Sequence, residues 1–287
     1  MLAAIEDLAL RLRPDLVLVY GDTNSTLAGA LAAAKLDIPI AHVEAGLRSY
    51  NRTMPEETNR VLTDHCSTLL FCPTQRAVDN LAAENIRQGV HLVGDTMYDA
   101  LVRFLPVAER HLDILDRLDI SDRKFLLATL HRPYNVDDPK ALGEIFKAFA
   151  RLDLPVVFPV HPRTLASIAA FGMDLPAGVR AVEPVGYLDM LVLLHRAAMV
   201  LTDSGGVQKE ACFAGTPCVT LRPETEWVET VEAGWNRLAW GDAEAILAAV
   251  EAQTTPPDHP LLAYGDGRAA EAIATTLVDF VPFGTSR

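Results

Sequence analysis

The sequence predicts an α/β protein with two Rossmann-like domains, each a doubly wound parallel sheet, that face each other across a cleft. Short apolar runs, such as residues 16–20 and 197–202, are typical of parallel strands covered on both faces. These runs alternate with segments of helical periodicity. The alternation pauses in a charged helical stretch that ends near Asp119 and restarts at Lys124, so we expect two domains.

The first domain is predicted to start with a helix over residues 1–12 and a strand over 16–20. An alanine-rich helix over 27–35 and a strand over 40–44 complete a right-handed βαβ unit. A sheet that began with these strands would leave its first edge uncovered, so we expect this domain to be truncated at its N-terminus. The further expected elements are an irregular loop (45–55), helices (56–65, 74–85), strands (67–72, 90–93) and a linker helix up to residue 119.

The second domain is predicted from the same alternation. Its expected elements are strands over 124–130, 155–160, 197–202 and 217–221, and helices over 139–152, 188–195 and 208–215. The last helix, over 267–281, has one apolar face and is expected to cross back onto the first domain. The predicted domain limits are therefore 1–119, 120–262 and, for the returning helix, 263–287.

Composition limits the partners. The chain has 287 residues and a formal net charge of −13, which argues against a nucleic-acid partner because phosphate backbones require clustered Lys and Arg. Its 4 cysteines form no Cys-x-x-Cys pair, as is typical of reduced thiols, so we expect a cytoplasmic protein. The sequence contains neither an apolar run long enough to span a bilayer nor an N-terminal export signal, so no membrane partner is predicted.

A phosphate site is predicted after the strand over 197–202. Ser204, Gly205 and Gly206 follow this strand and precede a helix, so unpaired N–H groups lie at the positive end of the helix dipole. Glu210 lies about two turns into the helix, where it could face a ribose next to a bound diphosphate. The alternative is a tight turn in which Ser204 caps the helix.

Polar residues also follow the other strands, where ligands bind in open α/β sheets. They are Asp22, Glu44, His131 and His161. Asp22 alone is better explained as a helix N-cap than as a catalytic residue. Glu44 is expected to be close to buried, and a buried carboxylate needs a proton or a cationic partner, for which Arg48 and Arg52 are candidates.

A charged cluster surrounds the loop after Glu44. Glu56 and Glu57 fall in the first turn of a helix, where the dipole already favours them, and Arg60 follows one turn later. Alternating charges of this kind can separate carboxylate pKa values, leaving one group as acid and another as base. His131 is followed by Arg132, a fixed cation. No spacing of His, Asp or Glu matches a metal site, so none is predicted, and the remaining histidines outside strand ends are interpreted as structural.

With these residues assembled, the chain resembles the non-hydrolysing UDP-N-acetylglucosamine 2-epimerases. The segments that carry the resemblance are Tyr-Gly-Asp-Thr-Asn-Ser (20–25), His-Val-Glu-Ala-Gly-Leu-Arg (42–48), Pro-Glu-Glu-Thr-Asn-Arg (55–60), Val-Gly-Asp-Thr (93–96), Thr-Leu-His-Arg (129–132), Thr-Asp-Ser-Gly-Gly-Val-Gln-Lys-Glu (202–210) and Tyr-Gly-Asp-Gly-Arg-Ala-Ala (264–270). Each is weak alone, but together they occur in the family's order over almost the whole chain.

The resemblance implies a GT-B type fold and C2 epimerisation of a UDP-sugar without a cofactor, through elimination and re-addition of UDP. It implies that Glu44 and Glu56 exchange protons with the sugar, that Asp22 assists, and that His131 stabilises the departing diphosphate. Substrate contacts are implied for Arg132, Ser204, Gly205, Gly206 and Glu210, and secondary or allosteric contacts for Glu57, Arg60 and His161. A homodimer and a role in polysaccharide biosynthesis fit the family.

This chain departs from the family in three ways. It lacks the additional N-terminal βαβ region that family members carry before the segment at Met1. Tyr134 stands where the family has an acidic residue, and the loop between Arg48 and Pro55 is shorter. The alternatives left open are epimerisation of a diacetamido-uronic UDP-sugar, a hydrolysing epimerase, a UDP-dependent glycosyltransferase and a non-catalytic UDP-sugar binder.

Overall fold

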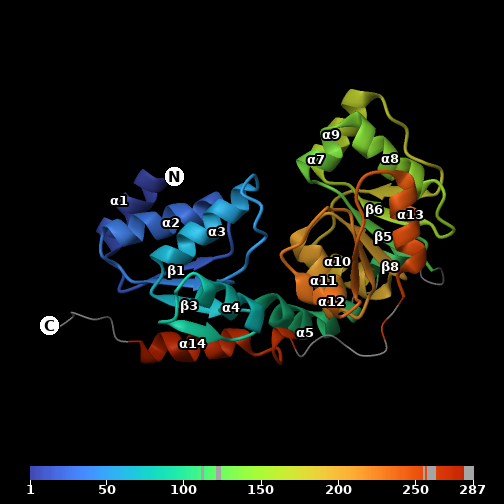
Figure 1. Cartoon of the computed structure of the whole chain (residues 1–287). Coiled ribbons are helices and arrows are strands. Elements are labelled where there is room, and N and C mark those ends of the chain that lie inside the picture. The colour runs from blue at the N-terminus through green and yellow to red at the C-terminus, as the bar shows by residue number, and fades with distance from the viewer. Residues whose placement is uncertain (111–112, 121–123, 255, 257–262, 281–287) are drawn as a thin grey trace. The chain divides into compact units, whose positions relative to one another are not determined.

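The structure, a computed structural model, describes residues 1–110, 113–120, 124–254, 256 and 263–280. It divides into two compact units, shown in Figure 1: residues 1–99 with 263–280, and the described residues between 100 and 256. Each unit contains one parallel β-sheet with helices, so the predicted α/β class with two parallel-sheet domains is confirmed. The predicted domain limits stay a prediction.

The first unit is built on a sheet with the strand order β1-β2-β3-β4, all parallel. Its elements in chain order are α1 (Leu2–Leu12), β1 (Val17–Tyr20), α2 (Asn24–Lys35), β2 (Ile40–Val43), α3 (Pro55–Cys66), β3 (Leu69–Cys72), α4 (Gln75–Ala83), β4 (Val90–Leu92), the start of α5 (Thr96–Glu109) and α14 (Ala269–Asp279). These bounds agree closely with the expected elements, except that the linker helix expected up to residue 119 ends at Glu109 in α5 and is followed by a separate short helix, residues 113–117.

Helices cover both faces of the first sheet. Val19 and Ile40 pack against Ala30 and Ala33 of α2, and Phe71 on the other face packs against Ile273 of α14. Asp99 of α5 fixes the start of α14 by accepting hydrogen bonds from the backbone N–H groups of Ala269 and Ala270, at 3.0 and 2.6 Å. The C-terminal helix therefore belongs to the first unit.

The second unit has the strand order β10-β9-β8-β5-β6-β7, all parallel. Its elements are the rest of α5, α6 (Asp113–Arg117), β5 (Leu126–Thr129), α7 (Pro133–Val136), α8 (Pro139–Phe149), β6 (Val156–Pro159), α9 (Pro162–Phe171), β7 (Val179–Val182), α10 (Tyr187–Arg196), β8 (Met199–Thr202), α11 (Gly205–Phe213), β9 (Cys218–Thr220), α12 (Val228–Glu232), β10 (Asn236–Leu238) and α13 (Ala243–Ala252).

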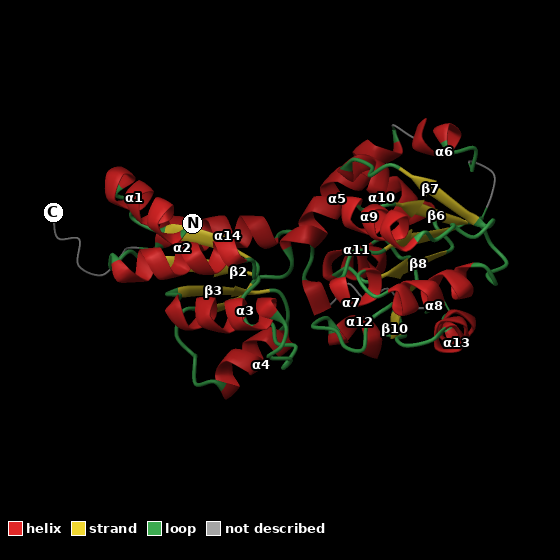
Figure 2. Cartoon of the chain, turned by 90° about the horizontal axis from the view of Figure 1, so that it is seen from above, coloured by secondary structure: helices red, strands yellow, loops and turns green. Residues whose placement is uncertain are grey.

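This order is the Rossmann order, with the topological switch point between β5 and β8. Side chains from α8, α9 and α13 share one core with β5, β6, β8 and β9. Helices α8 and α13 lie side by side (Figure 2), and α10 and α11 lie on the other side of the strands (Figure 1). The carboxyl ends of β5 and β8 are thus where a ligand site is expected.

The sheet of the second unit is wider than the sequence pattern indicated. Strands β7 and β10 were not predicted, and both lie at the edges of the sheet. Their sequences, Val-Arg-Ala-Val and Asn-Arg-Leu, include exposed polar side chains because an edge strand is covered less completely than a central one. The helices α7, α9, α12 and α13 were also not among the expected elements.

A buried arginine joins three parts of the first unit. The side chain of Arg48 is 1% exposed; its Nε and Nη2 bind the two carboxylate oxygens of Glu84, at 2.7 and 2.8 Å. Its Nη1 binds Asp64 Oδ2 at 2.7 Å. Arg48, which the sequence offered as a partner of Glu44, thus ties the loop after β2 to α3 and to the end of α4. The hydrogen bonds from Arg48 lower the pKa of Glu84 below its ordinary value of 4.5.

We expect Glu84→Gln to lower the free energy of unfolding at pH 7 by about 1 kcal/mol, because one carboxylate–guanidinium pair at a part-exposed position is lost. A carboxyl whose pKa is lowered by folding stabilises the protein above its unfolded pKa. This contribution disappears as the pH falls through the folded pKa. Urea denaturation between pH 7 and pH 3 should therefore show the difference from wild type closing on acidification. Asp79→Asn, on the exposed side of the same helix, is the control. A difference that stays constant down to pH 3 would contradict the assignment.

Candidate active site

The carboxyl edge of the first sheet brings Glu44 beside the turn after β1. Gly21 and Glu44 directly follow β1 and β2, and both have left-handed backbone conformations, with φ of 62° and 72°. A Cβ atom on Gly21 would lie 3.3 Å from Glu44 Oε2, so the absence of a side chain at position 21 leaves room for this carboxylate. Glu44 is half-buried rather than close to buried as the sequence suggested.

Asp22 is held by a buried arginine. Arg60 of α3 is 2% exposed, and its Nη2 donates to Asp22 Oδ2 at 2.5 Å. Asn59 also donates to the backbone carbonyl of Asp22, at 2.8 Å. The interpretation of Asp22 as a helix cap is wrong, since Thr23 caps α2 by accepting from the backbone N–H of Thr26. The Asp22 carboxylate is therefore positioned by α3.

Glu56 and Glu57 lie in the first turn of α3 and differ in their surroundings. Glu57 is 4% exposed, and its carboxylate accepts hydrogen bonds from the backbone N–H groups of Ser49 and Tyr50, at 2.8 and 2.9 Å. Arg60 Nη1 lies 3.3 Å from the same carboxylate. Glu57 thus anchors the loop that follows Glu44, whereas Glu56 is half-buried. The predicted substrate contacts of Glu57 and Arg60 stay predictions.

A buried histidine, His42, contacts the backbone of the turn at Gly21. His42 Nε2 lies 2.8 Å from the carbonyl oxygen of Gly21, and its Nδ1 lies 2.7 Å from Asp64 Oδ1. A carbonyl and a carboxylate only accept hydrogen bonds, so both ring nitrogens of His42 face acceptors. Asp64 also binds Arg48 and the backbone N–H of Gly46. The structural role expected of His42 is thus to hold the backbone of the Gly21 turn.

In the second unit, the switch point brings His131 and Ser204 to one edge. Thr129 of β5 and Thr202 of β8 are register partners, so the residues that follow them are neighbours. Ser204 caps α11, its Oγ accepting from the backbone N–H of Val207 at 3.3 Å. Asp203, between Thr202 and Ser204, is completely buried and accepts hydrogen bonds from the backbone N–H groups of His131 and Arg132. Sequence reasoning assigned Asp203 no role.

His161 and Glu210, two further predicted site residues, each contact another side chain of the second unit. The rings of His131 and His161 have centroids 5.6 Å apart. His161 caps α9, since its Nδ1 accepts from the backbone N–H of Arg163 at 3.1 Å. Glu210 lies in α11 and accepts a hydrogen bond from Tyr187; burial, together with the charge of Glu210 and this bond, raises the pKa of Tyr187 to about 12. The sequence reasoning missed Tyr187.

A buried ion pair, also missed, packs against the start of α11. Arg222 is 1% exposed, and its Nη2 donates to Glu226 Oε2 at 2.8 Å. A Cβ atom on Gly205 would lie 2.6 Å from Glu226 Oε1, closer than van der Waals contact allows. An alanine at position 205 would therefore require the Glu226 carboxylate, held by Arg222, to move. Arg222 follows the strand predicted over 217–221, so the search for polar residues after strands could have identified it as a candidate.

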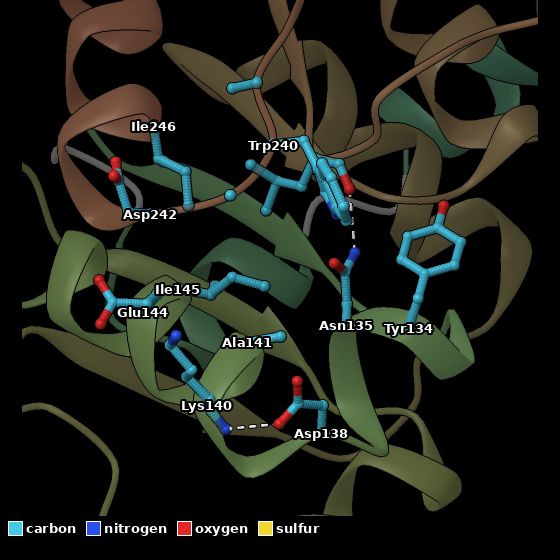
Figure 3. Close-up of a pocket in the computed structure, with 13 residues that line it drawn as sticks. Tyr134, Asn135, Asp138, Lys140, Ala141, Glu144, Ile145, Trp240, Asp242 and Ile246 are labelled. Atoms are coloured by element: carbon cyan, nitrogen blue, oxygen red, sulfur yellow. Dashed lines mark hydrogen bonds between the residues drawn. The ribbon is translucent and has the colours of Figure 1, made fainter.

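A cavity of about 420 Å³ lies between α7, α8 and the segment that joins β10 to α13 (Figure 3). Its wall includes Tyr134, Lys140 and Trp240, and no predicted site residue lines it. Asn135 in this wall donates to the carbonyl of Leu221 at 2.9 Å and to Asp203 Oδ2 at 3.1 Å. Asn135 therefore connects the wall of this cavity to Asp203, beside His131 and Ser204.

The predicted residues thus form one group in each unit. The first unit carries Asp22, Glu44, Glu56, Glu57 and Arg60, and the second carries His131, Arg132, His161, Ser204, Gly205, Gly206 and Glu210. Among the described residues, no cluster of three or more His, Cys, Asp or Glu side chains could hold a metal ion. Within the same residues, no helix is long and apolar enough to cross a membrane.

Comparison with known proteins gives consistent matches over the chain. The profile of the family described as UDP-N-acetylglucosamine 2-epimerase matches residues 1–278. A UDP-N-acetylglucosamine 2-epimerase homolog of Methanococcus maripaludis is 49% identical over 282 residues, which cover 96% of this chain and 79% of that protein. The UDP-2,3-diacetamido-2,3-dideoxy-D-glucuronate 2-epimerase of Pseudomonas aeruginosa is also 49% identical, over 286 residues that cover 96% of this chain and 78% of that protein.

Among solved structures, the crystal structure of Methanocaldococcus jannaschii UDP-GlcNAc 2-epimerase in complex with UDP-GlcNAc and UDP matches with a TM-score of 0.90. The two sequences are 42% identical, and the match covers 97% of this chain and 80% of that one. The chain belongs to the UDP-N-acetylglucosamine 2-epimerase family.

Proposed function

We propose that this chain interconverts UDP-N-acetylglucosamine and UDP-N-acetylmannosamine by inverting C2 of the sugar, without a cofactor. Family membership supports the reaction class. The observation that carries the proposal is Glu44: a non-glycine residue in a left-handed conformation, with its carboxylate beside the turn that leads to Asp22. Backbone strain of this kind costs about 1–3 kcal/mol and is concentrated at functional sites.

In the proposed first step, a carboxylate takes the proton from C2. The electron pair of the C2–H bond forms the C1=C2 double bond of a 2-acetamidoglucal. The C1–O bond breaks at the same time, and its electrons leave with the β-phosphate oxygen of UDP. In the reverse addition UDP returns to C1, and a second carboxylate protonates C2 from the opposite face. We assign these proton transfers to Glu44 and Glu56, with Asp22 assisting, because the three carboxylates belong to one unit and Glu44 and Glu56 are both part-exposed.

The second unit is proposed to hold UDP. Ser204, Gly205 and Gly206 begin α11, a helix of 9 residues whose first N–H groups can bind the diphosphate. Glu210, aligned by Tyr187, is proposed to bind the ribose, and His131 to stabilise the departing diphosphate. Arg132 is proposed to contact the diphosphate as well. The domain limits predicted from the sequence belong to this proposal.

A second candidate is epimerisation of the diacetamido-uronic UDP-sugar. It is favoured by the Pseudomonas aeruginosa relative, which is named for that substrate and is as identical to this chain as the Methanococcus maripaludis homolog. The same elimination and re-addition would apply. A homodimer, a cytoplasmic location and supply of polysaccharide precursors also belong to the proposal.

Proton NMR of the protein with UDP-N-acetylglucosamine in deuterated buffer tests the function. Deuterium at C2 together with a manno anomeric signal supports it. The uronic sugar is offered in a parallel sample, and turnover of that sugar alone would favour the second candidate. Release of UDP and free N-acetylmannosamine would instead indicate a hydrolysing enzyme. Binding of both sugars without exchange would contradict the epimerase proposal.

Replacing Glu44 by glutamine should leave UDP binding within about two-fold of wild type and lower C2 exchange by at least about 100-fold, because the proton acceptor is lost and the diphosphate contacts are not. Calorimetric titration with UDP and deuterium incorporation measure the two effects. Glu251→Gln, at an exposed position of α13, is the control. Exchange retained in the Glu44 variant would refute the role of this carboxylate.

Gly205→Ala should weaken UDP binding by about 10-fold or more and lower the free energy of unfolding by about 1–3 kcal/mol, because the added methyl collides with Glu226. Gly143→Ala on α8 is the matched control, since a Cβ there would meet only Met173 Cε, at 3.9 Å. That change should stabilise the protein by about 0.5–1 kcal/mol. Calorimetric titration measures the affinity of both variants for UDP, and urea denaturation measures their free energies of unfolding. Comparing the two variants separates an effect specific to position 205 from a general effect of replacing glycine by alanine.

A further inference from the structure

Asp203 is a fully buried carboxylate that faces His131. Its Oδ1 lies 3.0 Å from the backbone nitrogen and 3.2 Å from Nδ1 of His131. Its Oδ2 lies 2.9 Å from the backbone nitrogen of Arg132 and 3.1 Å from Asn135 Nδ2. Two backbone N–H groups and the Asn135 amide donate to this carboxylate, and the His131 ring nitrogen lies beside it, so the position of the carboxylate is fixed.

This contact determines which nitrogen of His131 carries a proton. A carboxylate only accepts hydrogen bonds, so the nitrogen that faces it, Nδ1, is the donor. Nε2 lies on the opposite side of the ring, which is 36% exposed. The ring thus has one nitrogen committed to Asp203, and the other is left for a ligand at the carboxyl edge of the sheet.

The other groups around His131 do not compete for this contact. The Nδ1 atom of His161 is occupied as an acceptor in capping α9. The Tyr134 hydroxyl stays protonated at neutral pH, because burial raises its pKa to about 12, with the charge of Asp203 contributing. Arg132 contributes a fixed positive charge next to the ring, and its backbone N–H binds Asp203. Asp203 is thus the carboxylate that faces Nδ1.

We propose that Asp203 is a positioning residue that holds the proton of His131 on Nδ1 and directs Nε2 toward the diphosphate leaving group. This inference rests on the proposed function and assigns a role to a residue that does not touch the substrate. When the C1–O bond breaks, negative charge grows on the β-phosphate oxygen. The protonated ring donates a hydrogen bond to that oxygen through Nε2–H, and its charge is balanced by Asp203. The proton stays on His131 throughout, so nothing is consumed.

The first test observes the wild-type protein and needs no activity. Nitrogen-15 NMR of the histidine rings, with His131 assigned by comparison with the His131→Asn variant, reports which nitrogen is protonated. The proposal requires Nδ1–H in the neutral ring. A neutral ring protonated on Nε2 would overturn it, whether or not the protein epimerises any sugar.

The second test is a double-mutant cycle with Asp203→Asn and His131→Asn, read by C2 deuterium exchange. Asp203→Asn alone should lower kcat by about 100-fold or more with little change in KM, because the ring loses both the acceptor that orients it and the negative charge that balances its protonated form. In the His131→Asn background the same change should cost less than about three-fold, because the ring it positions is gone. Equal losses in both backgrounds would overturn the proposal and indicate a purely structural role.

Two controls complete the cycle. Asp174→Asn, at an exposed position, should leave kcat unchanged. Calorimetric titration with UDP checks that the Asp203 variant is folded and binds. If it does not fold, the NMR measurement on wild type still decides the tautomer. Wild-type protein without C2 exchange but with Nδ1 protonated would count against the proposed reaction and not against the positioning contact.

Discussion

A buried carboxylate must be paired with hydrogen-bond donors or with a positive charge. In each of the two sheets, one such carboxylate fixes the residues that follow a strand. Asp203 gathers the backbone N–H groups of His131 and Arg132 at the switch point of the second sheet. Asp64 gathers His42, Arg48 and the N–H of Gly46 beneath the first sheet. In each unit one buried charge fixes the loop that follows a strand. The part-exposed groups above it can therefore be held in place without being buried themselves.

Most of the correct predictions came from one rule, that ligand-binding residues in open α/β sheets directly follow the strands. Apolar runs marked the central strands of both sheets, and the residues that follow them, from Asp22 to Ser204, lie at the carboxyl edges as expected. The rule was not applied to Arg222, which follows β9 and packs against Gly205. It also gave no warning of β7 and β10, because edge strands carry polar side chains that interrupt the apolar pattern.

Partner choice could not be read from the sequence because it depends on tertiary contacts. Arg48 lies near Glu44 along the chain, yet its bidentate partner is Glu84, on another helix. Thr23 rather than Asp22 caps α2, which leaves the neighbouring carboxylate for Arg60. Asp203 belongs to the motif that predicted the phosphate site, but its contact with His131 depends on the pairing of β5 with β8.

The left-handed backbone of Glu44 has a consequence for how this protein can change. Glycine adopts a φ of 72° without the steric cost that any side chain incurs, so the backbone alone would favour glycine at this position. A change to glycine at position 44 should therefore relieve backbone strain, and the proton transfer proposed for Glu44 is what would keep a glutamate there. Under that proposal, position 44 is a site where a more heat-resistant but inactive variant would arise by a single codon change.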